Sequence, residues 1–117
     1  MKIAGLFANA KGTKHFVAGE TIFREGDEGD FMYGVGDGKV AVRIGDRVIE
    51  TCATDDTFGE MAIIDHSPRM ASAVAASDCT LAMIDRREFL FLVHETPMFA
   101  IQVMSTMADR LRAAREH

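Results

Sequence analysis

Two opposite charges stand close together in an otherwise apolar stretch near the middle of the chain. Glu60 and Arg69 lie nine residues apart within FGEMAIIDHSPRMASAV, residues 58–74. An arginine presents a planar fork of donors that suits a phosphate, and it stays protonated at every physiological pH. A glutamate would repel that phosphate, so it is useful only if it accepts hydrogen bonds from another group, such as sugar hydroxyls. The pair therefore indicates a ligand with both an anion and hydroxyls, and a plain ion pair between the two side chains is the alternative.

A short helix is expected to begin beside Glu60. EMAII is long enough for one or two turns before DHSP ends them, and Gly59 lets a ligand approach the backbone closely. The first amides of a helix have no partner within it and carry partial positive charge, which suits an anion. Arg69 then enters a strand of small residues, ASAVA, whose side chains are too short to shield it. The stretch has the outline of an anion-binding site.

The surrounding sequence predicts a β domain that holds this site. From residue 13 to about 85, short apolar or β-branched runs are separated by glycine and aspartate, which is typical of antiparallel strands joined by tight turns. Turn residues at 36–38 and at 45–46 predict two successive hairpins. Residues 39–44 place a β-branched side chain at every second position, so one face of that strand is expected to meet a core.

Two helices are expected to close the chain. Asp85 and Glu88 have the spacing of a capping box at the start of an apolar helical pattern. Thr96-Pro97 provides a cap and a first-turn proline for a second, methionine-rich helix. The predicted fold class is mainly β with flanking helices (α+β). It forms a single domain, residues 1–117, with the β part at about 13–85 and the C-terminal helices at about 86–116.

Composition and charge favour a cytoplasmic protein that binds neither membranes nor nucleic acid. The chain is 48% hydrophobic and 26% charged without a run long enough to span a bilayer, and its apolar N-terminal stretch is too interrupted for a signal peptide. A net charge of −5 argues against general binding to phosphate backbones. The arginines of DRLRAAREH, Arg110 among them, are interpreted as a solvated helix end. Cys52 and Cys79 are expected to be reduced, partly buried thiols.

The sequence does not favour catalysis or a metal site. Asp65, His66 and Ser67 are adjacent along the chain, and adjacency does not build a triad. GVGDG sits between predicted strands and opens no helix, so it is not a dinucleotide fingerprint. The histidines show no metal-ligand spacing, and the carboxylates of REGDEGD lack the alternation of a calcium loop. We expect a binding protein and no enzyme.

The stretch at 58–74 strongly resembles the phosphate-binding cassette of the cyclic nucleotide-binding domain family. The shared pattern is F-G-E, a short apolar helix, then P-R and small residues that lead to valine. Upstream, FVAGETIFREGDEGDFMYGVGDGKVAV is similar to the family's opening strands, and DRREFLFLVHETPMFAIQVMSTMADRL is similar to its two closing helices. The resemblance implies an antiparallel β-roll in jelly-roll topology, with a cyclic purine mononucleotide, cAMP or cGMP, as the ligand.

By position, the resemblance also implies roles for the cassette residues. Glu60 would bind the ribose 2′-hydroxyl and Arg69 the cyclic phosphate. The backbone around them would complete the cradle at Gly59, Ala62, Met70 and Ala71. Relatives often carry Ala, Ser or Thr after the arginine, where a hydroxyl helps to recognise guanine. Met70 offers no hydroxyl donor, so cAMP is favoured over cGMP, and the expected base wall consists of Met61, Val74, Val42 and Ile49.

The second closing helix carries a short apolar seam. Its residues recur at spacings of four and three, which is a heptad pattern: Ala100, Met104, Met107, Leu111 and Ala114. Since relatives close this helix over the bound nucleotide, Met104, Met107 and Leu111 are expected to act as a lid and in a weak homodimer. In the alternative, the seam simply packs back on the β-roll.

The resulting functional hypothesis is a stand-alone sensor or regulatory module that signals through its C-terminal helix to an effector protein. Transcription regulators related to the catabolite activator protein carry such a domain followed by a helix-turn-helix, and this sequence reaches only His117. DNA readout would therefore come from another protein. The alternative is a degenerate fold kept as a protein-interaction module, or as a remnant of a transcription regulator that does not bind DNA.

Overall fold

The structure, a computed structural model, describes residues 2–8, 10 and 12–115, except for the side chain of Ala114. The strands are β1 (Thr13–Phe16), β2 (Thr21–Phe23), β3 (Met32–Asp37), β4 (Val40–Ile44), β5 (Arg47–Cys52), β6 (Thr57–Phe58), β7 (Ser72–Ala75) and β8 (Cys79–Ile84). The helices are α1 (Met61–Ile64), α2 (Arg86–Glu95) and α3 (Met98–Arg115). This is the mainly β architecture with flanking helices that the sequence predicts.

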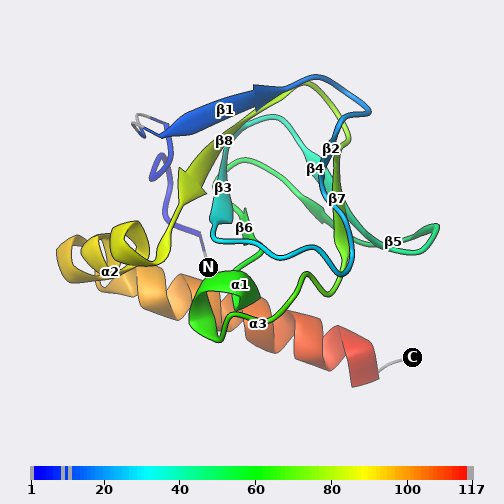
Figure 1. Cartoon of the computed structure of the whole chain (residues 1–117). Coiled ribbons are helices and arrows are strands. Elements are labelled where there is room, and N and C mark those ends of the chain that lie inside the picture. Colours follow the sequence, from blue (N-terminus) through cyan, green and yellow to red (C-terminus); the bar gives the residue numbers. More distant parts are fainter. Residues whose placement is uncertain (1, 9, 11, 116–117) are drawn as a thin grey trace.

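The strands form two antiparallel sheets. Their orders are β1-β8-β3-β6 and β2-β7-β4-β5, so the first strands of the chain pair with its last strands. Figure 1 shows the two sheets enclosing a common interior, with α1 and α3 across one end and α2 beside them. The jelly-roll-like arrangement therefore brings the segment between β6 and β7, which contains the predicted cassette, next to α3.

One of the two predicted hairpins is wrong. β4 and β5 pair as expected, with Ile44 opposite Arg47 at the turn, but β3 and β4 lie in different sheets. Gly38, at a φ of 90°, packs so tightly that a Cβ there would collide with the carbonyl of Asp78. Because this glycine is held against the start of β8, the chain crosses from one sheet to the other at this point instead of folding back.

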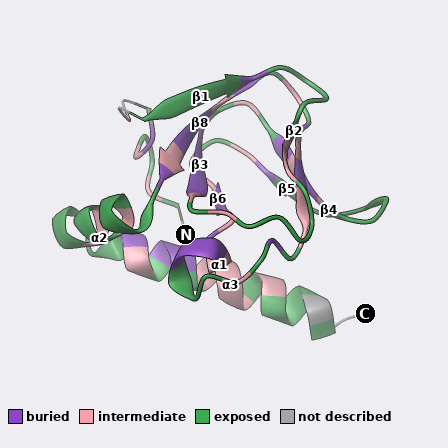
Figure 2. Cartoon of the chain, viewed as in Figure 1, coloured by how far each residue is buried: buried purple, intermediate pink, exposed green. Residues whose placement is uncertain are grey.

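Two apolar clusters form the core. Figure 2 colours buried residues purple, most clearly along β3 and in α1. The first cluster fills the space between the sheets and contains Phe58, Val40 and Leu81. The second joins the N-terminal segment, β3, β8, α1 and α3, and consists of Phe7, Met32, Ile63, Ala82, Ile84, Phe99 and Val103. Cys52 and Cys79 are free and buried, and burial raises the pKa of both thiols. The two cysteines therefore act as small apolar groups, as predicted.

The capping signal at the start of α2 is confirmed. Asp85 lies in the extended region, and its carboxylate accepts a hydrogen bond of 2.7 Å from the Glu88 amide. This bond satisfies one of the amides that a helix start leaves without a partner. Over the described residues, no helix has the length and apolar character needed to cross a membrane, α3 included.

Candidate ligand-binding site

A cavity of about 380 Å³ lies between the second sheet, the cassette and α3. Its size is within the range typical of small-molecule sites. The cassette contributes both flanks of α1, and α3 contributes the covering side. The lining residues are Phe23, Val42, Ile44, Ile49, Phe58, Gly59, Glu60, Met61, Ala62, Pro68, Arg69, Met70, Ala71, Met107, Arg110 and Leu111.

Arg69 lines the cavity, and several contacts fix the position of its guanidinium. Its guanidinium donates hydrogen bonds to the carbonyls of Gly59, at 3.0 Å, and Phe31, at 2.7 Å. The group also lies 4.1 Å from the centroid of the Phe23 ring, which is cation–π geometry. Only 7% of Arg69 is exposed, and burial lowers the pKa of its guanidinium from the ordinary value. An arginine remains protonated even so, and it therefore places a fixed positive charge beside the cavity.

Two glycines make room for the Arg69 guanidinium. A Cβ on Gly59, which has a φ of 78°, would lie 2.8 Å from Arg69 Nη1. A Cβ on Gly29 would collide with the same guanidinium. Gly29 belongs to the acidic loop between β2 and β3, and nothing in its local sequence distinguishes it from the neighbouring Gly26. Sequence reasoning therefore missed its role in seating the arginine.

Glu60 does not pair with Arg69, so the alternative of a plain ion pair between them is wrong. The ion pair that the structure describes for Glu60 is with Arg110 of α3. Only 2% of Glu60 is exposed. Burial raises the pKa of its carboxyl, while the positive charge of Arg110 acts in the opposite direction and lowers it. Since burial is the larger effect, the pKa of Glu60 stays above the ordinary glutamate value.

Arg110 connects three groups that line or support the cavity. Besides Glu60, it binds Glu50 Oε2 through Nε at 2.6 Å and the carbonyl of Thr57 through Nη2 at 3.1 Å. Its interpretation as part of a solvated helix end is therefore wrong. The signal for this role was the four-residue spacing of Gln102, Thr106 and Arg110, which places polar groups on one face of α3.

The four residues that the resemblance places around the cradle lie together at the cavity. Gly59, Ala62, Met70 and Ala71 all line the cavity. In the single turn of α1, Ile63 is the first residue whose amide bonds back, to the Glu60 carbonyl at 3.1 Å. The amides that precede it are those that a helix start leaves for other partners.

The predicted base wall is only partly assembled at the cavity. Met61, Val42 and Ile49 line it, whereas Val74 lies on β7 opposite Ala41 and is not among the lining residues. Met70 is 70% exposed at the cavity's edge. Sequence reasoning missed the apolar lining residues on strands, Phe23, Ile44 and Phe58, because their contribution depends on how the strands meet, and it also missed Pro68.

The predicted seam of α3 divides between two faces. Met107 and Leu111 line the cavity. Met104 does not, and it is 54% exposed. Ala100 is half-buried, and the side chain of Ala114 lies outside the described residues. The buried face of α3 is formed instead by Phe99, Gln102 and Val103. Among the seam residues whose side chains the structure describes, a lid role fits Met107 and Leu111.

Comparison with known proteins gives one family model that matches most of the chain. The model for the cyclic nucleotide-binding domain matches residues 13–96. A cAMP-dependent protein kinase regulatory subunit from Eremothecium gossypii is 42% identical over 72% of this chain and 18% of its own length. The cyclic AMP receptor protein of Thermus thermophilus is 36% identical over 82% of this chain and 47% of its own. The chain thus spans less than half of either relative.

Solved structures agree with this match. The structure described as Sp-2Cl-cAMPS bound to PKAR CBD2 superposes with a TM-score of 0.76 at 30% identity, over 89% of this chain and 69% of its own. The catabolite activator protein of Thermus thermophilus gives a TM-score of 0.75 at 33% identity, over 88% of this chain and 51% of its own. The β-roll with its cassette helix and closing helices is therefore the fold of these proteins.

Proposed function

This chain belongs to the cyclic nucleotide-binding domain family, and from that membership we propose that it binds a cyclic purine mononucleotide in the cavity between the cassette and α3. Arg69 holds the cyclic phosphate, and Glu60 holds the ribose 2′-hydroxyl. The protein acts as a cytoplasmic sensor or regulatory module without catalytic activity, and it passes the signal on through α3 to an effector protein. The two relatives described above are named for cAMP, and the solved complex holds Sp-2Cl-cAMPS, which supports this ligand class.

The observation that carries the proposal is a pair of buried polar atoms without partners. Four buried side-chain polar atoms among the described residues make no hydrogen bond, and the two that belong to cavity-lining residues are Glu60 Oε2 and Arg69 Nε. Leaving such atoms unpaired is costly, and native proteins rarely do so without a reason. One atom is an acceptor and the other a donor, so a hydroxyl and a phosphate oxygen would satisfy them. A ribose cyclic phosphate offers both groups on one ligand.

The rest of the cavity supports a purine more than a sugar phosphate alone. Most of the lining side chains outside the charged residues are apolar, including Val42, Ile49, Met61 and Met107. An apolar wall favours a flat base through burial and offers it few hydrogen bonds. Met70 lacks the hydroxyl that would recognise guanine, and cAMP is therefore favoured over cGMP.

Titration calorimetry with cAMP and cGMP tests the proposal directly. We expect heat of binding and a raised melting temperature, with cAMP the tighter ligand. Stabilisation follows RT ln(1 + [L]/Kd) and reaches about 2.7 kcal/mol at roughly a hundredfold excess over Kd. Linear AMP, which lacks the cyclic phosphodiester, is the matched control and should bind more weakly. Absence of both heat and stabilisation with either cyclic nucleotide would contradict the proposal.

One observation favours a second candidate, a degenerate fold retained for protein association. Arg110 of α3 forms an ion pair with Glu60, and Met107 and Leu111 of the same helix line the cavity. If that contact never opens, the cavity stays closed to the ligand. The calorimetric experiment repeated on Arg110→Met separates the two candidates. A nucleotide sensor binds in the wild type, whereas a permanently closed fold binds nothing until the arginine is removed, or nothing at all.

A further inference from the structure

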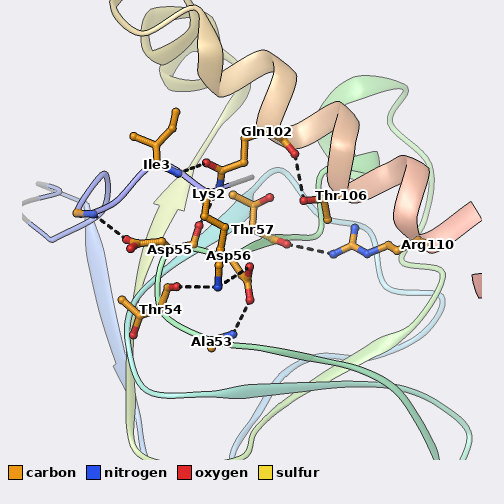
Figure 3. A network of polar contacts seen from close by, with 11 residues as sticks. Lys2, Ile3, Ala53, Thr54, Asp55, Asp56, Thr57, Gln102, Thr106 and Arg110 are labelled. Atoms are coloured by element: carbon orange, nitrogen blue, oxygen red, sulfur yellow. Dashed lines mark hydrogen bonds and ion pairs between the residues drawn. The ribbon is translucent and has the colours of Figure 1, made fainter.

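Gln102 joins three segments that are distant in the sequence. Its Nε2 donates a hydrogen bond of 2.9 Å to the Asp55 carbonyl, and its Oε1 accepts one of 2.7 Å from the Ile3 amide (Figure 3). Only 1% of the glutamine is exposed. Both ends of a fully buried amide are therefore satisfied, one by the N-terminal segment and the other by the turn that precedes β6. Displacing α3 at this point would leave both partners unpaired.

The packing of α3 changes just after Gln102. On its N-terminal side, Phe99 is fully buried and meets the Phe7 ring edge-on, with 6.1 Å between the centroids. Val103 is 2% exposed in the same cluster. Beyond it, the residues on the same face of the helix, Thr106, Met107 and Arg110, are only half-buried. The first half of α3 is thus part of the core, and the second half rests on the cavity.

In the described part of α3, Arg110 is the only other residue whose side chain forms hydrogen bonds or ion pairs with the β-roll. It binds the Thr57 carbonyl, two residues beyond the carbonyl that Gln102 binds. Gln102, Thr106 and Arg110 follow one another at intervals of four residues, so they lie on the same face of α3 (Figure 3). Gln102 and Arg110 both contact the segment at residues 55–57. Gln102 and Arg110 therefore hold the same segment of the roll from one face of α3.

We propose that Gln102 is a positioning residue that fixes the first half of α3, so that movement of the helix at the cavity is confined to residues 104–115. The Gln102 contacts involve no cavity residue, so they persist when the cavity side of the helix shifts. When the second half of α3 moves, the contacts of Arg110 with Glu60 and Thr57 break. The contacts of Gln102 stay in place and limit the movement to the residues that follow. The response to a nucleotide rests on the proposed function, whereas the anchoring by Gln102 does not.

Residue-resolved amide exchange tests this division of α3 with two independent perturbations. In one arm, saturating cAMP is added to the full chain. In the other, Arg110→Met is measured without nucleotide. In both arms we expect exchange to change within residues 104–115 and to stay constant at 98–103 and at the Ile3 amide. A change that spreads through 98–103 in either arm overturns the proposal.

The Gln102→Met variant keeps a side chain of similar size and removes both hydrogen bonds. It should abolish the boundary in amide exchange between residues 98–103 and 104–115. Exchange at the Ile3 amide is expected to rise by about fivefold, the effect of one typical hydrogen bond. Combined with Arg110→Met, the change should then extend into residues 98–103. Ser105→Ala is the matched control and should keep the boundary where it is. A boundary that survives in Gln102→Met would refute the positioning role.

The outcomes stay separable from those of the proposed function. If calorimetry shows no nucleotide binding, the proposed function fails, and the Arg110→Met arm alone decides the inference. If Gln102→Met does not fold, the boundary in the wild type and in Arg110→Met supports or overturns it.

Discussion

Glu60 and Arg69 both line the cavity and carry opposite charges. Each keeps a polar atom buried without a partner, and each is anchored by contacts that do not involve the other. Arg69 is fixed by backbone carbonyls, whereas Glu60 is fixed by a side chain of α3. A ligand phosphate would thus meet the Arg69 guanidinium in a position that the protein backbone already fixes. A ribose hydroxyl would meet the Glu60 carboxylate, which also binds Arg110 of α3.

Replacing Arg69 with lysine tests the phosphate role. A lysine keeps the charge but cannot reach the Gly59 and Phe31 carbonyls and a ligand phosphate together. Losing one charge-assisted hydrogen bond costs about 1.5–3 kcal/mol, so affinity for cAMP should fall roughly tenfold or more in calorimetry. The exposed Arg112→Lys is the control and should bind normally. Unchanged affinity in Arg69→Lys would remove the arginine from the phosphate site.

The space that Gly29 leaves for the Arg69 guanidinium can be tested without replacing the arginine itself. In Gly29→Ala, the added methyl group collides with the guanidinium and must displace it. We expect weaker cAMP binding with the fold retained, since the backbone at this glycine has no positive φ. Gly12→Ala is the matched control, because its Cβ would meet only the Met83 carbonyl at an ordinary 3.6 Å. Equal affinities for the two variants would show that this space is unimportant.

The carboxyl of Glu60 should give stability a distinctive pH dependence. Burial raises the pKa of Glu60, so the folded state binds this proton more tightly than the unfolded chain does. The contribution of Glu60 to the free energy of unfolding is therefore fully present below the ordinary glutamate pKa and is lost as the pH rises through the raised value. Urea denaturation between acidic and neutral pH should show wild type losing stability relative to Glu60→Gln. A constant difference across this range would contradict the raised pKa.

At the scale of elements, α3 serves the cavity and the surface with different faces. Met107 lines the cavity, while Met104 is exposed together with Ile101. The two methionines belong to one predicted seam, yet the helix places them in different environments. This division separates the two roles that the sequence assigned to the same residues, the lid and the weak homodimer.

Two glutamate substitutions should therefore have different effects. Met104→Glu places a charge on the exposed face and should abolish self-association in sedimentation experiments, with cAMP affinity unchanged. Met107→Glu places a charge in the apolar part of the cavity and should weaken cAMP binding in calorimetry. A monomeric mass for the wild type at all concentrations would remove the homodimer. Equal binding by Met107→Glu and wild type would remove Met107 from the lid.

Local sequence signals predicted the elements well where the deciding contacts are themselves local. The Asp85 cap depends on a residue three positions away, and the hairpin of β4 and β5 depends on its own turn. The other predicted hairpin, at 36–38, failed because the packing of Gly38 against Asp78 decides the path of the chain.

The same distinction explains which site residues were found. The cassette residues Glu60 and Arg69 lie within one short stretch that carries its own pattern. The missed contacts join distant positions: Arg69 to Phe31 across 38 residues and Arg110 to Glu60 across 50. No local pattern encodes such pairs, because they arise only when the roll has closed.

At the scale of the whole molecule, the strand pairing determines the order in which the chain can fold. β1 pairs with β8 and β2 with β7, so neither sheet is complete until residues 72–84 have left the ribosome. Pairing between such distant segments makes β domains fold more slowly than helical ones. Among the described elements α3 emerges last, and we expect it to dock after the strands have begun to pair. During synthesis, we therefore expect the cavity to be an open cleft until α3 covers it.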